Sequence, residues 1–164
     1  MASVQYITHE IPAWRAAANY LAMADLAPFG FPDMREQIWL RSLSDGAYEV
    51  CCIPFRVYGM SLGDIVELDA DGKMIVRVRT KGGHRACRVF FPPKVGEPGL
   101  RDIRNRIDTT VRAQGLVVEW SGERHLAVDV TAERGIDTLW AEIQPEIGDE
   151  SALWEWGDVE EFRT

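Results

Sequence analysis

The sequence has no long hydrophobic run. No segment of its 164 residues approaches the roughly eighteen consecutive apolar residues that a membrane-spanning helix needs, so the sequence excludes such a span. Residues 1–10 lack a basic start followed by an apolar run, and we therefore expect no secretory signal. Hydrophobic residues make up 46% of the chain and charged residues 27%, as in an ordinary globular protein. We predict a soluble, cytoplasmic protein with its own hydrophobic core.

Cysteine is scarce, with Cys51, Cys52 and Cys87 alone. An odd number, two of them adjacent, suits neither a disulfide framework nor a zinc site with CxxC spacing. No two histidines have the spacing of metal ligands, and the glycine-rich phosphate loops of the GxGxxG and GxxxxGK types are missing. We therefore predict reduced thiols, no metal and no cofactor.

One segment of the chain lacks acidic residues, and another lacks basic residues. There is no acidic residue between Lys73 and Lys94, and no Lys or Arg between Arg134 and Arg163. The chain up to residue 95 carries 11 Lys and Arg against 10 Asp and Glu, whereas the remainder carries 7 against 16, and the net charge is −8. This asymmetry predicts an electrostatic partner, either inside the chain or outside it.

Short alternating runs joined by turns predict strands in the first half of the chain. The turns Asp45-Gly46 and Asp71-Gly72 each join two such runs into a hairpin, whereas residues 11–26 fit either a helix or a strand. The expected strands span residues 37–43, 48–53, 64–68, 73–80 and 84–91. We predict that they form a small, curled, barrel-like antiparallel sheet over residues 1–95.

In the second half of the chain, segments whose apolar residues have helical spacing alternate with short expected strands. Apolar residues recur every three or four positions from Leu100 to Val111, and Gly115 follows as a helix C-cap. Thr131 is expected to cap a second helix, which Pro145 and Gly148 end. The strands expected around these helices span residues 85–91, 116–120, 125–130 and 151–159.

These elements follow one another as β-α-β-β-α-β, the ferredoxin-like order, when strand 85–91 is counted first. We therefore predict an α+β protein. It would have a β lobe over residues 1–95 and an α+β lobe over residues 96–164 that shares strand 85–91, the two forming one compact unit.

A basic face is expected on a hairpin around Gly82-Gly83. With a two-residue turn there, Arg77 would lie opposite Arg88, and the other face of the hairpin would be apolar and buried. The candidate anion-binding residues on the basic face are Arg77, Arg79, Lys81, His84 and Arg88. Because like charges directly opposite each other destabilise a sheet, three situations are open: the acidic C-terminus covers the face, an external anion binds it, or solvent surrounds it. Nucleic acid is the weakest of the anions, since no aromatic residues interleave the basic ones.

Two tryptophans lie in the acidic segment 150–161. Trp154 and Trp156 are two residues apart, so in a strand they face the same side. Buried, they would anchor the C-terminus to the sheet; exposed, they would form with the carboxylates a surface for a basic protein partner. The candidate partner-binding residues are Trp154, Trp156, Glu150, Glu155, Asp158, Glu160 and Glu161.

A cysteine and a histidine could form a nucleophile and base. Cys51 or Cys52 would be the nucleophile, with His84 or His125 as the base. In an alternating strand only one of two adjacent cysteines faces the core, and cysteine in a strand is most often a packing residue. We therefore assign no catalytic residue.

Three further polar residues are expected on the surface. His125 lies beside Arg124 after a turn, which favours exposure. Glu119 and Asp129 fall on opposing strands and could form a carboxylate pair for acid–base chemistry. Two exposed charges on a sheet face are commoner, and the sequence supplies no nearby donor.

Several motifs follow one another along the chain: Glu36-Gln37-Ile38-Trp39-Leu40, Cys52-Ile53-Pro54-Phe55, Gly63-Asp64-Ile65-Val66, Lys81-Gly82-Gly83-His84-Arg85 and Leu126-Ala127-Val128-Asp129-Val130. The set resembles the bacterial family known as domain of unknown function 4265. That family shares an E-x-L-W start, an N/C-I-P-F motif, a G-D-x-V motif and an S-G-H strand followed by an Arg. The resemblance spans roughly residues 19–156, with Gly82 where the family has serine. It implies no catalytic residue, because the family has no established activity.

We predict a non-catalytic binding or regulatory protein that binds or neutralises a basic protein partner through its acidic C-terminal surface. One alternative is a nucleotide- or RNA-binding module that uses the basic hairpin face. A second alternative is an enzyme that uses Cys51 or Cys52 with His84. The sequence sets no oligomeric state.

Overall fold

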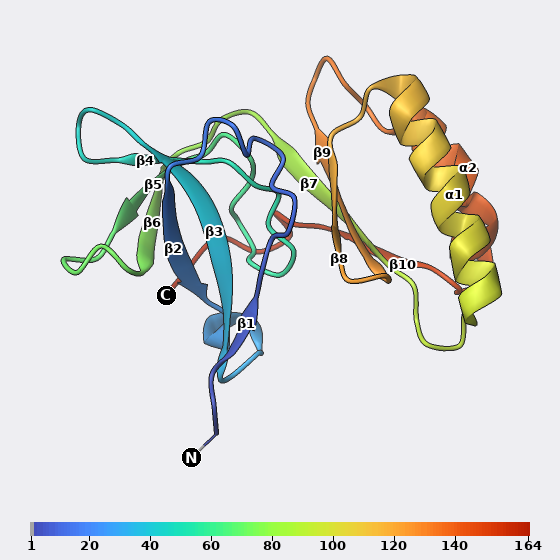
Figure 1. The fold of residues 1–164 in the computed structure, drawn as a ribbon, viewed down its shortest axis with the longest axis horizontal. Coiled ribbons are helices and arrows are strands. Elements are labelled where there is room, and N and C mark those ends of the chain that lie inside the picture. The colour runs from blue at the N-terminus through green and yellow to red at the C-terminus, as the bar shows by residue number, and fades with distance from the viewer. Residues whose placement is uncertain (1) are drawn as a thin grey trace.

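The computed structural model describes residues 2–164 and contains two β-sheets and two α-helices (Figure 1). Six strands from the first half of the chain form a mixed sheet, sheet A. Four strands from the second half form an antiparallel sheet, sheet B, and both helices lie on one face of it (Figure 1). The predicted α+β class is confirmed. No helix within residues 2–164 is long and apolar enough to cross a membrane.

Sheet A has the strand order β1-β3-β4-β5-β6, with β2 paired to the other side of β3. Its strands are β1 (Gln5–Ile7), β2 (Tyr20–Asp25), β3 (Met34–Ser42), β4 (Tyr48–Val50), β5 (Ile65–Leu68) and β6 (Ile75–Thr80), with a short 3-10 helix at Ala27–Phe29. Residues 20–25 are thus a strand, which settles the ambiguity of segment 11–26. The turns Asp45-Gly46 and Asp71-Gly72 join hairpins as predicted, and Gly46 and Gly72 have the positive φ that such tight turns require.

The barrel-like form predicted for this sheet is wrong. Sheet A neither curls nor closes within the described part of the chain. It is also mixed rather than antiparallel, because β1 runs parallel to β3. The strand at residues 84–91, which the prediction placed next to residues 73–80, joins sheet B instead.

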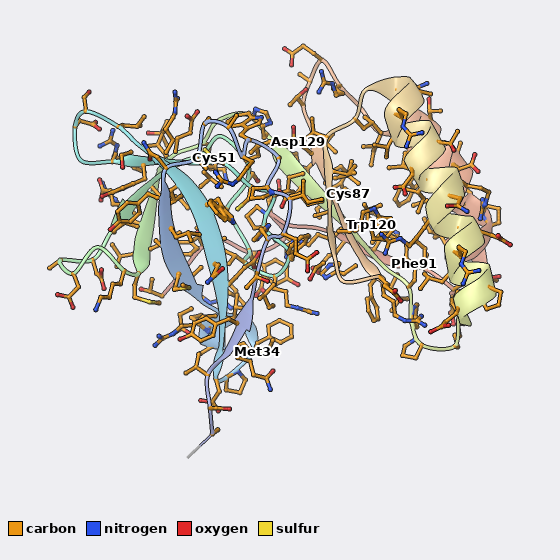
Figure 2. All side chains as sticks on the ribbon, in the orientation of Figure 1. Met34, Cys51, Cys87, Phe91, Trp120 and Asp129 are labelled. Atoms are coloured by element: carbon orange, nitrogen blue, oxygen red, sulfur yellow. The ribbon has the colours of Figure 1, made fainter. Side chains whose placement is uncertain are left out.

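Sheet B has the strand order β10-β7-β9-β8. Its elements follow along the chain as β7 (Arg85–Phe90), α1 (Glu97–Gln114), β8 (Val118–Ser121), β9 (His125–Val130), α2 (Asp137–Gly148) and β10 (Leu153–Trp156). This β-α-β-β-α-β succession is the predicted one, and Gly115 ends α1 in the left-handed conformation. Cys87, Phe91 and Trp120 lie on the face of the sheet that packs against the helices (Figure 2).

Two details of α2 differ from the prediction. The N-cap is Ile136, and Thr131 instead closes a tight turn by accepting a hydrogen bond from the amide of Arg134. Pro145 lies inside the helix, which continues to Gly148. Thr131 is five residues before Ile136, so its side chain is too far along the chain to cap this helix.

The predicted hairpin between residues 73–80 and 84–91 is wrong. Strand β6 pairs with β5, whereas β7 pairs with β9 and β10, so Gly82-Gly83 carries the chain from sheet A to sheet B. Ala86, Cys87 and Arg88 are all buried, because the helices cover one face of β7 and the segment between β4 and β5 covers the other. A strand covered on both faces belongs in the middle of a sheet.

A small apolar cluster joins the two sheets. The segment between β4 and β5 supplies Ile53, Phe55 and Leu62, which pack against Ala86 of β7 and Ala127 of β9. This cluster fills the space between the sheets on the side of sheet B opposite the helices. The polar groups described below surround it.

Candidate functional site

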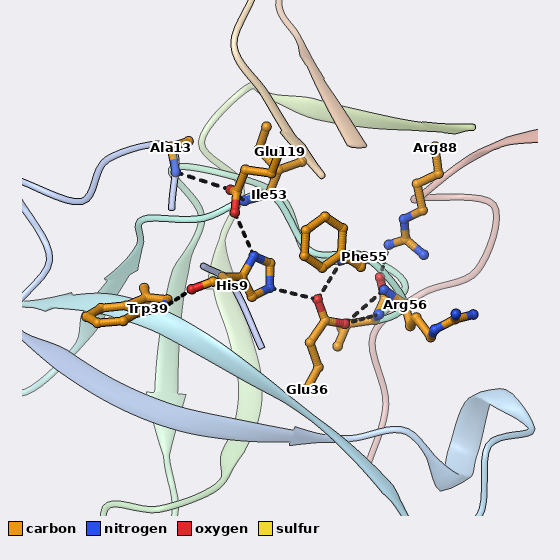
Figure 3. Close-up of polar contacts among 10 residues, drawn as sticks. His9, Ala13, Glu36, Trp39, Ile53, Phe55, Arg56, Arg88 and Glu119 are labelled. Atoms are coloured by element: carbon orange, nitrogen blue, oxygen red, sulfur yellow. Dashed lines mark hydrogen bonds and ion pairs between the residues drawn. The ribbon is translucent and has the colours of Figure 1, made fainter. Parts of the chain in front are cut away.

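A buried histidine lies between two buried carboxylates at the junction of the sheets (Figure 3). Nδ1 of His9 is 2.7 Å from Oε1 of Glu119 on β8, and Nε2 is 3.0 Å from Oε1 of Glu36 on β3. Both ring nitrogens face carboxylate oxygens, and only the imidazolium form donates from both. We call these three residues the His9 hub.

The two carboxylates also accept hydrogen bonds from backbone amides, most of them in the segment between β4 and β5 (Figure 3). Glu36 accepts hydrogen bonds from the amides of Phe55, Arg56 and Val57, and Glu119 accepts them from Ala13 and Ile53. All four carboxylate oxygens are therefore satisfied. The expectation that Glu119 lies on the surface without a donor is wrong.

Burial and hydrogen bonding act in opposite directions on the hub. Burial alone would raise the pKa of Glu36, but the hydrogen bond and charge of His9 and the amide of Phe55 lower it to about 2. Burial alone would lower the pKa of His9, but its contacts with Cys52, Glu119 and Glu36 raise it. The His9 hub is an ionic network that links the two sheets. Its ring nitrogens and carboxylate oxygens all have partners within the protein, so none of them is available to a ligand.

A second histidine is held by Asp129 on β9. Nδ1 of His84 lies 2.8 and 2.9 Å from the two carboxylate oxygens of Asp129, and the edge of Trp14 packs against the imidazole. Asp129 is buried, contrary to expectation, and burial raises its pKa although His84 lowers it. The pair lines a cavity of about 350 Å³ together with Thr131 and Arg134. Glu119 and Asp129 thus bind separate histidines instead of pairing with each other.

A third set of polar side chains lines a pocket at the edge of the junction between the sheets. The pocket measures about 260 Å³ and is lined by Arg56, Arg88, Phe90, His125, Leu153, Trp154 and Glu155. We call it the rim pocket. It brings together Arg88, predicted to bind anions, with Trp154 and Glu155 from the predicted partner-binding segment.

Arg88 is buried to 1% exposure, which is unusual for an arginine. Its Nη2 donates to the carbonyl of Val57, its Nη1 lies 3.5 Å from Glu155, and its guanidinium lies 5.0 Å from the ring centre of Tyr58. A Cβ at Gly157 would lie 2.9 Å from Nη2, so glycine is what lets the C-terminal segment cross the guanidinium. Burial lowers the pKa of Arg88, which nonetheless keeps its charge because arginine titrates so far above neutral pH.

Two residues that line the rim pocket each have one nitrogen that is sealed from solvent and unpartnered. Within residues 2–164, Nε of Arg88 and Nδ1 of His125 have no hydrogen-bond partner. His125 is buried rather than exposed as expected, and burial together with the charges of Arg56 and Arg88 lowers its pKa to about 4. Arg56 is half-buried, rests on the ring of Phe31, and forms no ion pair with any described residue. The pocket therefore carries two cations, a neutral imidazole and one carboxylate.

The other predicted anion-binding residues are dispersed, because the hairpin that would have aligned them does not form. His84 binds Asp129 as described, and the remaining three form ion pairs with residues of sheet A or of the segments beside it. These pairs are Arg77 with Glu67, Arg79 with Asp45, and Lys81 with Asp64. Neighbouring Arg85 binds Asp158 of the C-terminal segment. Acidic partners from several parts of the chain thus neutralise the basic residues, and the C-terminus supplies only some of them.

The predicted partner-binding residues are divided between internal contacts and the surface. Glu155 accepts a hydrogen bond from Tyr58, and Asp158 and Glu160 pair with Arg85 and Arg163. Trp156 is half-buried beneath the guanidinium of Arg85, whereas Trp154 is 42% exposed. Glu150 and Glu161 are exposed. Trp156 therefore helps to anchor the segment, and Trp154, although partly exposed, packs on Trp140 of α2 with 4.6 Å between the ring centres.

The cysteines lie away from these pockets. Cys51 and Cys52 are both fully buried, so the expectation that only one faces the core is wrong; strand β4 ends at Val50, and the alternation ends with it. Burial raises the pKa of Cys51 to about 11 and that of Cys87 to about 12, and it also raises the pKa of Cys52. The thiols are protonated at neutral pH, which disfavours them as nucleophiles. Residues 2–164 contain no group of three or more His, Cys, Asp or Glu placed to hold a metal ion.

Comparison with known sequences identifies the family. The family described as Domain of unknown function (DUF4265) matches residues 36–156, which is most of the chain. The chain belongs to this family. The resemblance inferred from the motifs is thus confirmed. Residues of the motifs have visible roles: Glu36 of the first is in the His9 hub, and Asp64 of the third binds Lys81 and the amide of Gly82 in the fourth.

Comparison with solved structures gives the fold alone. The chain is similar to a hypothetical protein from Neisseria gonorrhoeae whose crystal structure is described as novel, with a TM-score of 0.62 and 13% sequence identity. The similarity covers 86% of this chain and 96% of the other. A search of curated proteins found no match. The comparisons therefore give this chain a family and a similar fold, and any function has to be argued from its own side chains.

Sequence reasoning missed His9 and Arg56. His9 is separated by 110 residues from Glu119, and only the folded chain brings them together. The sequence did contain a signal for Glu36, because this carboxylate shares the buried face of an alternating strand with Ile38 and Leu40. Arg56 follows the Ile53-Pro54-Phe55 motif, and no pattern in the sequence marks it as part of a pocket.

Proposed function

We propose that this DUF4265 protein is a non-catalytic, cytoplasmic binding protein whose rim pocket holds a small anionic ligand. The observation that supports this most is the excess of cationic side chains at the pocket, which Arg56 and Arg88 both line. Arg56 is half-buried and forms no ion pair with any described residue, so its charge is available to an anion.

The charges around the pocket favour an anion over a neutral ligand. Arg56 and Arg88 outnumber the single carboxylate of Glu155, and Glu155 is already engaged by Tyr58. Burial lowers the pKa of His125, and the charges of Arg56 and Arg88 lower it further. An anion entering the pocket would meet a positive field from partly buried groups, which solvent screens less than exposed ones.

A catalytic function finds less support. The thiols of Cys51 and Cys52 are buried, and their pKa values are raised, so neither is a nucleophile at neutral pH. Binding of a basic protein partner by the acidic C-terminal surface stays a prediction. Three of its acidic residues are used in contacts within the chain, and exposed Leu153 and Trp154 are its best support.

The experiment is a thermal-shift and calorimetric screen of small anions: acetate, benzoate, sulfate and inorganic phosphate at low ionic strength. At least one is expected to raise Tm and to bind with one-to-one stoichiometry. The Arg56→Gln variant, which keeps a donor but removes a half-buried charge, is expected to weaken that affinity about tenfold, equivalent to about 1.4 kcal/mol. Arg101→Gln, which removes an exposed charge on α1, is the matched control.

Two outcomes would contradict the proposal. One is that no anion in the screen raises Tm or releases heat on addition to the wild-type protein. The other is that Arg101→Gln weakens binding as much as Arg56→Gln, because that would reflect the net charge of the protein and not the pocket.

A further inference from the structure

One end of sheet B is left uncovered on the face opposite the helices. Ala86 of β7 is buried on this face beneath the segment between β4 and β5. Side chains an even number of residues apart in a strand face the same side, so Phe90 points the same way as Ala86. The register of β10 places Leu153 directly opposite Phe90. These two side chains are 37% and 52% exposed, and we call the pair the apolar ledge.

The apolar ledge belongs to the rim pocket, because both of its residues line that pocket. On one side, the ring of Phe90 meets the imidazole of His125 edge-on, with 6.2 Å between the ring centres. On the other side, Leu153 lies on β10, which is the edge strand of sheet B. A ligand with an apolar part would remove both side chains from water, which favours binding.

Arg56 supplies the charge that the lining of the pocket leaves unbalanced. Arg88 is already engaged, because it lies 3.5 Å from Glu155 and donates to the carbonyl of Val57. His125, with a pKa of about 4, is neutral at pH 7. Arg56 forms no ion pair with any described residue. A ligand head with one negative charge balances Arg56, and a second negative charge would be repelled by Glu155.

The volume of the pocket limits the ligand to a short one. About 260 Å³ lies below the roughly 300–1,000 Å³ that is typical of sites for drug-sized ligands. The apolar ledge has one aromatic and one aliphatic side chain, so a flat ring would find no pair of rings to stack between. An alkyl chain needs apolar area alone, because the hydrophobic effect is non-directional. A short alkyl chain therefore suits the ledge.

We infer that the ligand of the rim pocket is a short-chain amphiphile with one negative charge. Its head lies at the guanidinium of Arg56, and its alkyl chain lies along Phe90 and Leu153. This inference rests on the proposed anion-binding function and names the chemical class of the ligand.

The test is isothermal titration calorimetry at pH 7 with four straight-chain probes: acetate, butyrate, hexanoate and 1-hexanol. Each methylene added from acetate to hexanoate is expected to raise the affinity about two- to fourfold. A fully buried methylene gives the upper value, which is equivalent to about 0.8 kcal/mol. Hexanol is expected to bind at least tenfold more weakly than hexanoate, because it has the chain without the charge.

The outcomes of this titration distinguish the inference from the proposal on which it rests. If acetate, butyrate and hexanoate bind with the same affinity, or if only sulfate or inorganic phosphate binds, the inference is overturned and the anion-binding proposal stands. If none of these anions binds, both fall. Both also fall if hexanol binds as tightly as hexanoate, because the charge would then contribute nothing.

Two leucine variants test the position of the chain. Leu153→Ala is expected to weaken hexanoate binding about fivefold and to leave acetate binding unchanged, and its exposure makes it tolerant of truncation. Leu21→Ala truncates a leucine that is 40% exposed on β2, outside the pocket, and is the matched control. Equal hexanoate affinity of the two folded variants would overturn the placement of the chain.

A second copy of the chain is the alternative occupant of the apolar ledge, and sedimentation velocity without ligand tests it. The wild-type protein and Leu153→Ala are expected to sediment alike. A wild-type dimer that Leu153→Ala converts to a monomer would show that protein covers the ledge, and it would overturn the inference.

Discussion

At the scale of single residues, His9 is the most constrained group in the protein. Its two ring nitrogens face the carboxylates of Glu36 and Glu119, and all three side chains are buried. Removing one partner from a buried ionic group of this kind is strongly destabilising, because the remaining partners stay charged and desolvated. Truncating any member of the His9 hub is therefore far more damaging than removing a surface ion pair.

The raised pKa of His9 predicts a dependence of stability on pH. Because the folded-state pKa lies above the unfolded value of 6.5, the stabilisation is complete below pH 6.5 and is lost as pH rises through the folded-state pKa. The free energy of unfolding in urea should therefore fall as pH rises above 6.5, and His9→Gln should remove that slope. Nitrogen-15 shifts should show both ring nitrogens protonated at pH 7. A neutral ring there would contradict the assignment.

His125 shows the opposite behaviour. Its folded-state pKa of about 4 lies below the unfolded value of 6.5, so its contribution reduces stability as pH falls from 6.5 to about 4. His125→Phe should abolish this acid-side loss. It should also raise the free energy of unfolding at pH 7 by about 1–3 kcal/mol, because it removes a buried nitrogen without a partner.

A His125→Phe variant that is less stable than the wild type at pH 7 would contradict this prediction and would assign His125 a packing role.

At the scale of elements, local patterns predicted most of the strands and both helices. The hairpin turns at Asp45-Gly46 and Asp71-Gly72 and the glycine cap at Gly115 each depend on a few neighbouring residues, so the sequence contains them directly. The pairing partner of β7 depends on the whole fold. The Gly82-Gly83 turn suggested β6, but the burial of both faces of β7 places that strand between β10 and β9.

The crossing between the sheets depends on Gly82. A Cβ there would lie 2.4 Å from the carbonyl oxygen of Gly63, which is backbone and cannot move aside as a side chain would. Gly82→Ala should therefore lower the free energy of unfolding by about 1–3 kcal/mol in urea.

Gly135→Ala is the matched control for Gly82→Ala, because its added Cβ would meet nothing within 4 Å. Equal stability of the two variants would show that the chain passes from sheet A to sheet B by a different path.

At the scale of the whole molecule, the candidate site exists only where the sheets meet. The rim pocket takes Arg56 from the segment after β4, Arg88 from β7, His125 from β9, and Trp154 from β10. From the sequence, Arg88 was predicted to lie on an anion-binding face and Trp154 on a separate surface for a basic protein partner. Their convergence follows from the strand order of sheet B, which pairs β10 with β7, and that order depends on contacts between residues more than 60 positions apart.

The most direct test of the central claim is a nuclear magnetic resonance titration of the wild-type protein with acetate, benzoate, sulfate and inorganic phosphate in turn, observed at the arginine Nε–H and tryptophan indole N–H signals. With at least one of these anions, the Arg56 and Arg88 signals should shift together and saturate at one equivalent site. The indole of Trp120, which lies beneath the helices and faces Asp108, should not move. If the Arg56 and Arg88 signals stay in place with all four anions, or Trp120 shifts as much as they do, the rim pocket is not an anion-binding site.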